Sequence, residues 1–230
     1  MFSVKIRSMR ILVLSCIHNQ IDKLSKVLDK VNIKDIDLII CNGDFTDMFY
    51  NPSEFDQVDM CEVIVERLLA LNKPLLVVPG NHDPYETLDV FEDYNINLHG
   101  KFKTVGGLSF VGFGGAATPF NTVFEPTEEE IERALNKNAD KILGGVLVVH
   151  NPPKDTKCDK VTTGEHVGSV SVRKTIEKTR PLLVVSGHIH EAFSVDKIGN
   201  SVVLNPGAVF ENRYAIVEIK GKEVKCELKC

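Results

Sequence analysis

Short runs of aliphatic residues recur along this chain, and polar residues follow five of these runs directly. The runs are nearly continuous and do not alternate with polar residues, so they predict strands that are buried on both faces of a sheet. The five runs with the clusters that follow them are 11–14 before Cys16-Ile17-His18, 38–40 before Gly43-Asp44-Phe45-Thr46-Asp47, 75–78 before Gly80-Asn81-His82-Asp83, 146–149 before His150, and 182–185 before Gly187-His188-Ile189-His190.

Segments with helical periodicity separate the first three strands. Apolar residues recur every three or four positions from Ile21 to Val31, which predicts a helix over 19–31. A second helix is expected from about 58 to 72, after a turn at 51–53, and a short third helix over 86–94. Strands that alternate with helices are typical of crossover units in a parallel sheet.

The second half of the chain predicts a more β-rich arrangement. Gly106-Gly107 joins two short runs, 101–105 and 108–113, as a hairpin. Thr127 and Glu130 have the spacing of a capping box at the start of a helix through 139. After a long irregular segment at 151–168, a helix is expected at 170–178. Four strands close the chain at 193–197, 201–204, 215–219 and 224–228.

These elements predict the α/β class, with two sheets packed together, in one domain over 1–230. Residues 1–8 are expected to be an N-terminal extension outside that fold. The formal net charge of −5 argues against an extended nucleic-acid surface. The six cysteines are scattered, which favours reduced thiols. Neither a membrane span nor a signal peptide is evident, so a cytoplasmic protein is expected, and its oligomeric state stays open.

Five of the seven histidines lie in the clusters. A single histidine at a strand end is usually an ordinary hydrogen-bonding residue, but five at such positions by chance are improbable. Ligands of open α/β sheets bind beyond the carboxyl ends of the strands, so the clusters are expected to converge on one crevice. Carboxylates mixed with imidazoles suit divalent transition metals. For the other two histidines, His99 and His166, an ordinary structural role is the better interpretation.

The clusters, in their order along the chain, resemble the motifs of the calcineurin-like metallophosphoesterase family. That family has Asp-x-His, Gly-Asp-x-x-Asp, Gly-Asn-His-Asp or Gly-Asn-His-Glu, a lone histidine after a strand, and Gly-His-x-His. The resemblance covers about residues 10–207, and all five motifs in order are a specific signal. It implies two mixed sheets flanked by helices, and a pair of divalent metal ions, with manganese, iron, zinc and nickel as the candidates.

The resemblance also implies a role for each site residue. Asp44 would bridge the two ions. The remaining ligands implied for the two ions are Cys16, His18 and His190 for one, and Asn81, His150 and His188 for the other. His82 would act at the leaving-group oxygen as a general acid or charge stabiliser, and Asp47 would orient it. The reaction implied is hydrolysis of a phosphoester by a metal-bound hydroxide.

Cys16 departs from the family pattern, which has aspartate at this position. A thiolate ligand would favour zinc or a similar ion. A weakened first metal position or a mononuclear enzyme are the alternatives, and the sequence leaves them open.

A small phosphoester is the expected partner, and a phosphodiester is favoured over a phosphomonoester. Met48 stands where protein serine/threonine phosphatases of this superfamily carry an arginine, which lowers that alternative. The small bacterial and archaeal branch of the family, several members of which hydrolyse phosphodiesters, is the better match. A binding scaffold with weak or no catalysis is the competing class.

Overall fold

A computed structural model describes residues 8–49 and 56–230, and its first sheet has five strands. The strand order is β11-β10-β1-β2-β3, with β1, β2 and β3 parallel and β10 and β11 antiparallel. The bounds are β1 Met9–Leu14, β2 Leu38–Asn42, β3 Leu75–Val78, β10 Tyr214–Lys220 and β11 Glu223–Lys229.

The second sheet has six strands in the order β4-β5-β6-β7-β9-β8. Its four central strands are parallel, and β4 and β8 pair antiparallel at the two edges. The bounds are β4 Phe102–Val105, β5 Leu108–Phe113, β6 Val146–Val149, β7 Leu183–Val185, β8 Ser194–Ile198 and β9 Ser201–Asn205. The strands expected near the end of the chain are thus shared between the two sheets.

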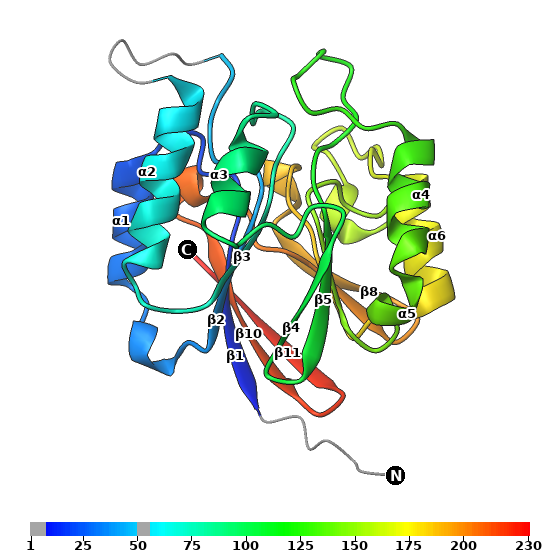
Figure 1. The fold of residues 1–230 in the computed structure, drawn as a ribbon. Coiled ribbons are helices and arrows are strands. Elements are labelled where there is room, and N and C mark those ends of the chain that lie inside the picture. Colours follow the sequence, from blue (N-terminus) through cyan, green and yellow to red (C-terminus); the bar gives the residue numbers. More distant parts are fainter. Residues whose placement is uncertain (1–7, 50–55) are drawn as a thin grey trace.

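The two sheets pack face to face, and helices cover both outer faces (Figure 1). Side chains such as Val13 and Ile40 from the first sheet meet Phe110 and Val148 from the second in a continuous apolar layer. Helices α1 Ile21–Asp29, α2 Gln57–Leu69 and α3 Thr87–Asp93 lie on the first sheet. Helices α4 Glu128–Lys137, α5 Ala139–Ile142 and α6 Val170–Thr179 lie on the second. Strands buried on both faces need apolar residues at consecutive positions, which explains the continuous aliphatic runs of the sequence. The expected α/β class with two mixed sheets is confirmed.

Helix ends follow the local chemistry of the sequence. The capping box of α4 is formed: Thr127 Oγ1 accepts from Glu130 N at 3.2 Å, and Glu130 Oε2 accepts from Thr127 N at 2.8 Å. The helix expected through 139 breaks at Asn138, whose φ of −114° is not helical, and α5 begins directly after it. Short 3₁₀ turns complete the fold: η1 Ile33–Asp35, η2 Lys157–Asp159, η3 His190–Ala192 and η4 Val209–Glu211.

The long irregular segment after β6 is organised around the buried side chain of Asp159. Its carboxylate accepts from Thr156 N at 2.8 Å and from Gly168 N at 3.0 Å, and it contacts His166 Nδ1 at 2.7 Å. A buried carboxylate with this many partners explains how a segment with little regular structure keeps one conformation.

Three further expectations concern a turn, membrane-spanning helices and the cysteines. The turn expected at 51–53 lies outside the described residues. None of the helices in the described part of the chain has the length and apolar character to cross a membrane. All six cysteines are free thiols, as expected.

Candidate metal centre

The five polar clusters meet where the carboxyl ends of the parallel strands of both sheets come together. The loops after β1, β2 and β3 come from the first sheet, and those after β6 and β7 come from the second. Three groups of potential metal ligands form there, and within each group the ligand atoms lie within 4.8 Å of one another. The convergence expected from the strand ends is therefore present.

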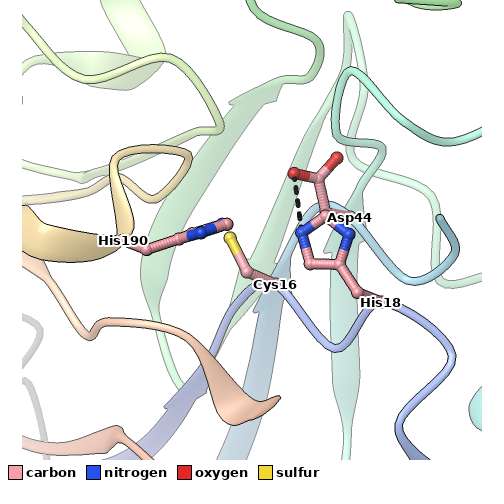
Figure 2. Close-up of side chains that lie close together, drawn as sticks. All are labelled: Cys16, His18, Asp44 and His190. Atoms are coloured by element: carbon pink, nitrogen blue, oxygen red, sulfur yellow. Dashed lines mark ion pairs between the residues drawn. The ribbon is translucent and has the colours of Figure 1, made fainter. Parts of the chain in front are cut away.

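The first ligand group consists of Cys16, His18, Asp44 and His190 (Figure 2). The loop after β1 supplies Cys16 and His18, the loop after β2 supplies Asp44, and η3 supplies His190. His18 Nε2 lies 3.5 Å from Asp44 Oδ2, and the sulfur of Cys16 points towards the ring of His190. One sulfur, one carboxylate and two imidazoles therefore surround one point.

The second ligand group consists of Asp44, His150 and His188, and Asn81 lies beside it. His150 Nε2 is 3.1 Å from Asp44 Oδ2 and 3.2 Å from Asn81 Oδ1. Asp44 belongs to both groups, so one carboxylate lies between two sets of potential ligands.

Two glycines allow the close approach of the loops around Asp44. A Cβ on Gly80 would lie 2.1 Å from Asp44 Oδ1, and a Cβ on Gly43 would lie 2.3 Å from His150 Nδ1. Gly43 also has a φ of +105°, a region that side chains other than glycine rarely adopt. His82 N donates to Asp44 Oδ1 at 2.9 Å, which completes the placement of the carboxylate.

A third group joins His18, Asp47 and His82. His82 Nδ1 lies 3.3 Å from Asp47 Oδ1, and His18 Nδ1 lies 4.0 Å from Asp47 Oδ2. The His82 ring packs edge-on against the His18 ring at 4.9 Å between centroids. Asp47 thus contacts His82, the imidazole that the family resemblance implied it would orient.

The electrostatics of the site keep Asp44 ionised and the imidazoles of His188 and His190 neutral, whereas the charge of Asp44 outweighs burial and raises the pKa of His150. Burial opposes ionisation of Asp44, but His150 and His18 together hold its pKa well below the usual range. Burial, together with the charge of His150, lowers the pKa of His188 to about 3. Burial and His18 lower that of His190 to about 4. Neutral imidazoles keep the lone pairs that metal binding requires.

In contrast to the imidazoles of His188 and His190, the thiol of Cys16 has a raised pKa. Burial and the nearby charge of Asp44 raise the pKa of its thiol, so without a cation the sulfur keeps its proton. A metal ligand must be the thiolate, so any cation at Cys16 has to displace that proton.

The unpaired atoms of the site show that divalent cations fit it. The buried Nε2 atoms of His18 and His190 have no hydrogen-bond partner among the residues that the structure describes. His150 Nδ1 faces the carbonyl oxygen of Asn42 at 2.6 Å, and Nε2 faces the oxygens of Asp44 and Asn81. When Nδ1 donates its proton to that carbonyl, the Nε2 lone pair opposes two oxygens, an arrangement that a cation between them would stabilise.

Two residues to which the sequence analysis gave no role, Thr122 and Asp83, position the predicted ligands. Thr122 Oγ1 accepts from Asn81 Nδ2 at 3.1 Å, which turns the amide oxygen towards His150. Asp83 is buried and links two loops, because it accepts from Gly80 N at 2.7 Å and from Thr46 N at 2.9 Å. The motif Gly-Asn-His-Asp signalled Asp83, but no local pattern distinguished Thr122 in its loop.

The two histidines expected to be structural lie outside the ligand groups found among residues 8–49 and 56–230. His99 Nδ1 accepts from Gly114 N at 2.9 Å, and burial lowers the pKa of His99 to about 4. His166 contacts Asp159 in the loop after β6.

Comparison with known sequences identifies the class of protein. The sequence profile of the calcineurin-like phosphoesterases matches residues 9–192. The chain therefore belongs to the calcineurin-like phosphoesterase family, a family that generally uses divalent metals.

Two relatives and one solved structure are similar to this chain. An uncharacterized protein of Methanocaldococcus jannaschii, MJ1162, is 41% identical over 150 residues, which are 62% of this chain and 69% of the relative. A probable glycerophosphodiester phosphodiesterase, GpdQ of Arcobacter nitrofigilis, is 26% identical over 78% of this chain and 65% of its own length. The crystal structure of TT1561 of Thermus thermophilus shares the fold, with a TM-score of 0.71 and 20% identity over 96% of this chain and 99% of that one.

Proposed function

We propose that this chain is a metal-dependent phosphoesterase that hydrolyses a phosphodiester, or less readily a phosphomonoester, with two divalent cations. The observation that carries the proposal is the position of Asp44, whose carboxylate belongs to both ligand groups. A shared carboxylate offsets the repulsion between two adjacent cations, which a two-metal centre requires. Bound cations of this kind acidify a water molecule and neutralise charge on the phosphoryl oxygens.

The proposed ligands are the residues whose donor atoms face one another across the centre. Asp44 bridges the two positions. The other ligands are Cys16, His18 and His190 in the first ligand group, and Asn81, His150 and His188 in or beside the second. The preferred ions are manganese, iron, zinc or nickel, because imidazole and thiolate donors suit them better than magnesium.

His82 is proposed to act on the leaving-group oxygen. When Nδ1 donates to Asp47 Oδ1, at 3.3 Å, the proton for the leaving group is held at Nε2. Asp47 keeps this tautomer and stabilises the charge on the ring. His82 lines the cavity beside the first ligand group, so a bound phosphoester lies within its reach.

The two alternatives raised by the sequence receive less support. A scaffold needs no cluster of buried imidazoles with unpaired nitrogens, and such atoms destabilise a fold by about 1–3 kcal/mol each when they stay unpaired. A protein phosphatase needs a cation for the phosphate next to Asp47, where Met48 and Phe49 stand. The relative named as a phosphodiesterase adds support for a diester substrate.

The test is metal-dependent hydrolysis of bis(4-nitrophenyl) phosphate beside 4-nitrophenyl phosphate. The purified chain is stripped with a chelator, reloaded separately with each candidate ion, and assayed for activity and metal content. We expect activity only in reloaded samples, with two ions per chain at saturation and faster turnover of the diester. A folded protein that binds these ions without hydrolysing either ester would refute the proposal and favour a scaffold.

A further inference from the structure

A cavity of about 310 Å³ opens beside the first ligand group, and two phenylalanines form part of its wall. Its lining includes the imidazoles of His18, His82 and His190, so a molecule in the cavity touches the proposed reaction centre. Ligand pockets commonly measure about 300–1,000 Å³, so this cavity suits a small molecule. The aromatic residues are Phe49 and Phe210.

Phe210 is held by the same loop that supplies the ligands Cys16 and His18. Its ring centroid lies 5.4 Å from that of His18 and 4.9 Å from that of His190. The backbone N of Phe210 donates to Cys16 O at 3.5 Å, and the preceding residue, Val209, donates to Ser15 O at 2.9 Å. The aromatic ring is therefore positioned relative to the proposed ligands by backbone contacts.

Phe49 is positioned by the carboxylate that contacts His82. Asp47 Oδ1 accepts from Phe49 N at 3.0 Å and lies 3.3 Å from His82 Nδ1. The ring of Phe49 meets the His82 ring at 5.5 Å between centroids, and yet the residue is 72% exposed. An aromatic side chain that borders the reaction centre and remains exposed offers apolar surface to a bound molecule.

The charges on the cavity wall limit how much negative charge a bound anion can carry. Within the described part of the chain, neither lysine nor arginine lines this cavity, and Asp47 adds negative charge to its wall. Residues 50–55, next in sequence to Phe49, contain neither lysine nor arginine. A phosphomonoester dianion would bring a second negative charge without a side-chain cation to meet it, whereas a phosphodiester brings only one.

We infer that Phe49 and Phe210 form a subsite for a planar aromatic group, such as a nucleobase or an aryl ring, on the ester arm that a phosphodiester retains. The inference rests on the proposed phosphoesterase function and names its substrate class. The aromatic arm packs on the two phenylalanines while the phosphoryl group lies at the ligand groups. His82, beside Phe49, then faces the leaving-group oxygen.

The test varies the retained arm and keeps the leaving group constant. The substrates are 4-nitrophenyl phosphate and its methyl, phenyl and thymidine 5′-diesters, all of which release 4-nitrophenol. We expect kcat/KM to be highest for the phenyl and thymidine diesters, lower for the methyl diester and lowest for the monoester. Phe49→Ala and Phe210→Ala should each lower kcat/KM for the aromatic diesters by about tenfold, mainly through KM, and by less than about twofold for the methyl diester.

Phe120→Ala is the matched control, because Phe120 is 73% exposed and does not line this cavity. Phe120→Ala should leave kcat/KM unchanged for all four substrates. If the phenylalanines only support the imidazoles, their removal would slow all four substrates equally and lower metal content. That outcome would refute the aromatic subsite, and so would unchanged kinetics in both variants.

A binding experiment separates this inference from the proposed function. Calorimetry on the metal-loaded chain compares thymidine 5′-monophosphate with methyl phosphate, which carries the same charge. We expect the thymidine ester to bind at least about tenfold more tightly, with the preference lost in the Phe49→Ala/Phe210→Ala double variant. Equal binding of both esters would refute the subsite even if hydrolysis is observed. An aromatic preference without hydrolysis would refute the proposed function alone.

Discussion

The first and second ligand groups share Asp44 but differ in how the protein holds them. In the second group, His150 is fully buried and bonded to the backbone of Asn42, and Thr122 orients Asn81. In the first group, His18 and His190 keep unpaired Nε2 atoms among the described residues, and Cys16 contributes a protonated sulfur. The second group is therefore organised in advance of a cation, whereas the first needs a cation to satisfy its atoms.

Because of this difference, the two proposed metal positions need not have the same affinity or ion preference. Ligands that neighbouring groups already orient bind a cation without further ordering. A thiol that must lose its proton binds only ions that stabilise the thiolate strongly. We therefore expect the second group to fill first and the first group to select the softer ion.

Asp44→Asn should cause the largest effect, because it removes the carboxylate that both groups share. The amide lacks the charge that offsets the repulsion between the two ions. We expect metal content to fall at both positions and turnover to fall by more than about 10³-fold. Metal content is measured by plasma emission and turnover with bis(4-nitrophenyl) phosphate.

Asp140→Asn is the control for that change, because Asp140 is exposed and pairs with Lys141 away from the site. Two bound ions per chain in the Asp44 variant would contradict the bridging role.

His82→Asn should leave both groups filled and act on chemistry. General acid catalysis typically contributes about 10²–10⁴-fold, so we expect a loss of at least about 10²-fold on a diester with an alkoxide leaving group. The loss should be smaller for 4-nitrophenolate, which leaves without a proton. An equal loss on both substrates, or loss of bound metal, would exclude the proposed role of His82.

Cys16→Ser should weaken the first group and leave the second unchanged. A neutral hydroxyl is a poor ligand, so we expect the dissociation constant of one of two zinc ions to rise by at least about tenfold. In cobalt-loaded wild type, a thiolate-to-cobalt absorption band in the near ultraviolet should be present, and the serine variant should lack it. Cys16→Asp should restore two-ion binding with manganese.

Cys230→Ser is the control, because Cys230 is an exposed thiol. All variants are measured under reducing conditions, which prevent oxidation of the remaining cysteines. Wild type and Cys16→Ser with the same zinc content and cobalt spectrum would show that Cys16 is not a ligand.

Thr122→Val should have the smallest effect and should be confined to the second group. The valine removes the acceptor for Asn81 Nδ2, so the amide oxygen is no longer held towards His150. Loss of such a supporting contact typically costs about 10- to 100-fold in metal affinity, and we expect the lower end of that range. Competition with a chromogenic chelator measures each ion separately.

Thr118→Val is matched to it, because Thr118 and Thr122 both donate to Glu125 but only Thr122 contacts Asn81. If both valine variants lose affinity equally, the loop as a whole and not the orientation of Asn81 supports the second group.

Much of the site was predictable from the chain because its residues follow buried strands. His18, Asp44, His150 and His188 each stand within a few residues of an aliphatic run, and parallel strands bring their carboxyl ends to one edge. Thr122 and Phe210 carried no such signal. Thr122 lies in a loop far from any of the five runs, and Phe210 lies in a 3₁₀ turn between two strands of different sheets.

The sequence alone determined the strands, the helix caps and the residue types at the strand ends, because burial on both faces and capping are local chemical requirements. Which of these side chains meet depends on how the two sheets pack. Asp44 reaches His150 because Gly43 has no Cβ to separate the loop after β2 from His150 of the second sheet, and Gly80 has none to separate the loop after β3 from Asp44. Such contacts depend on how two sheets pack through residues distant in sequence, and no local pattern encodes that packing.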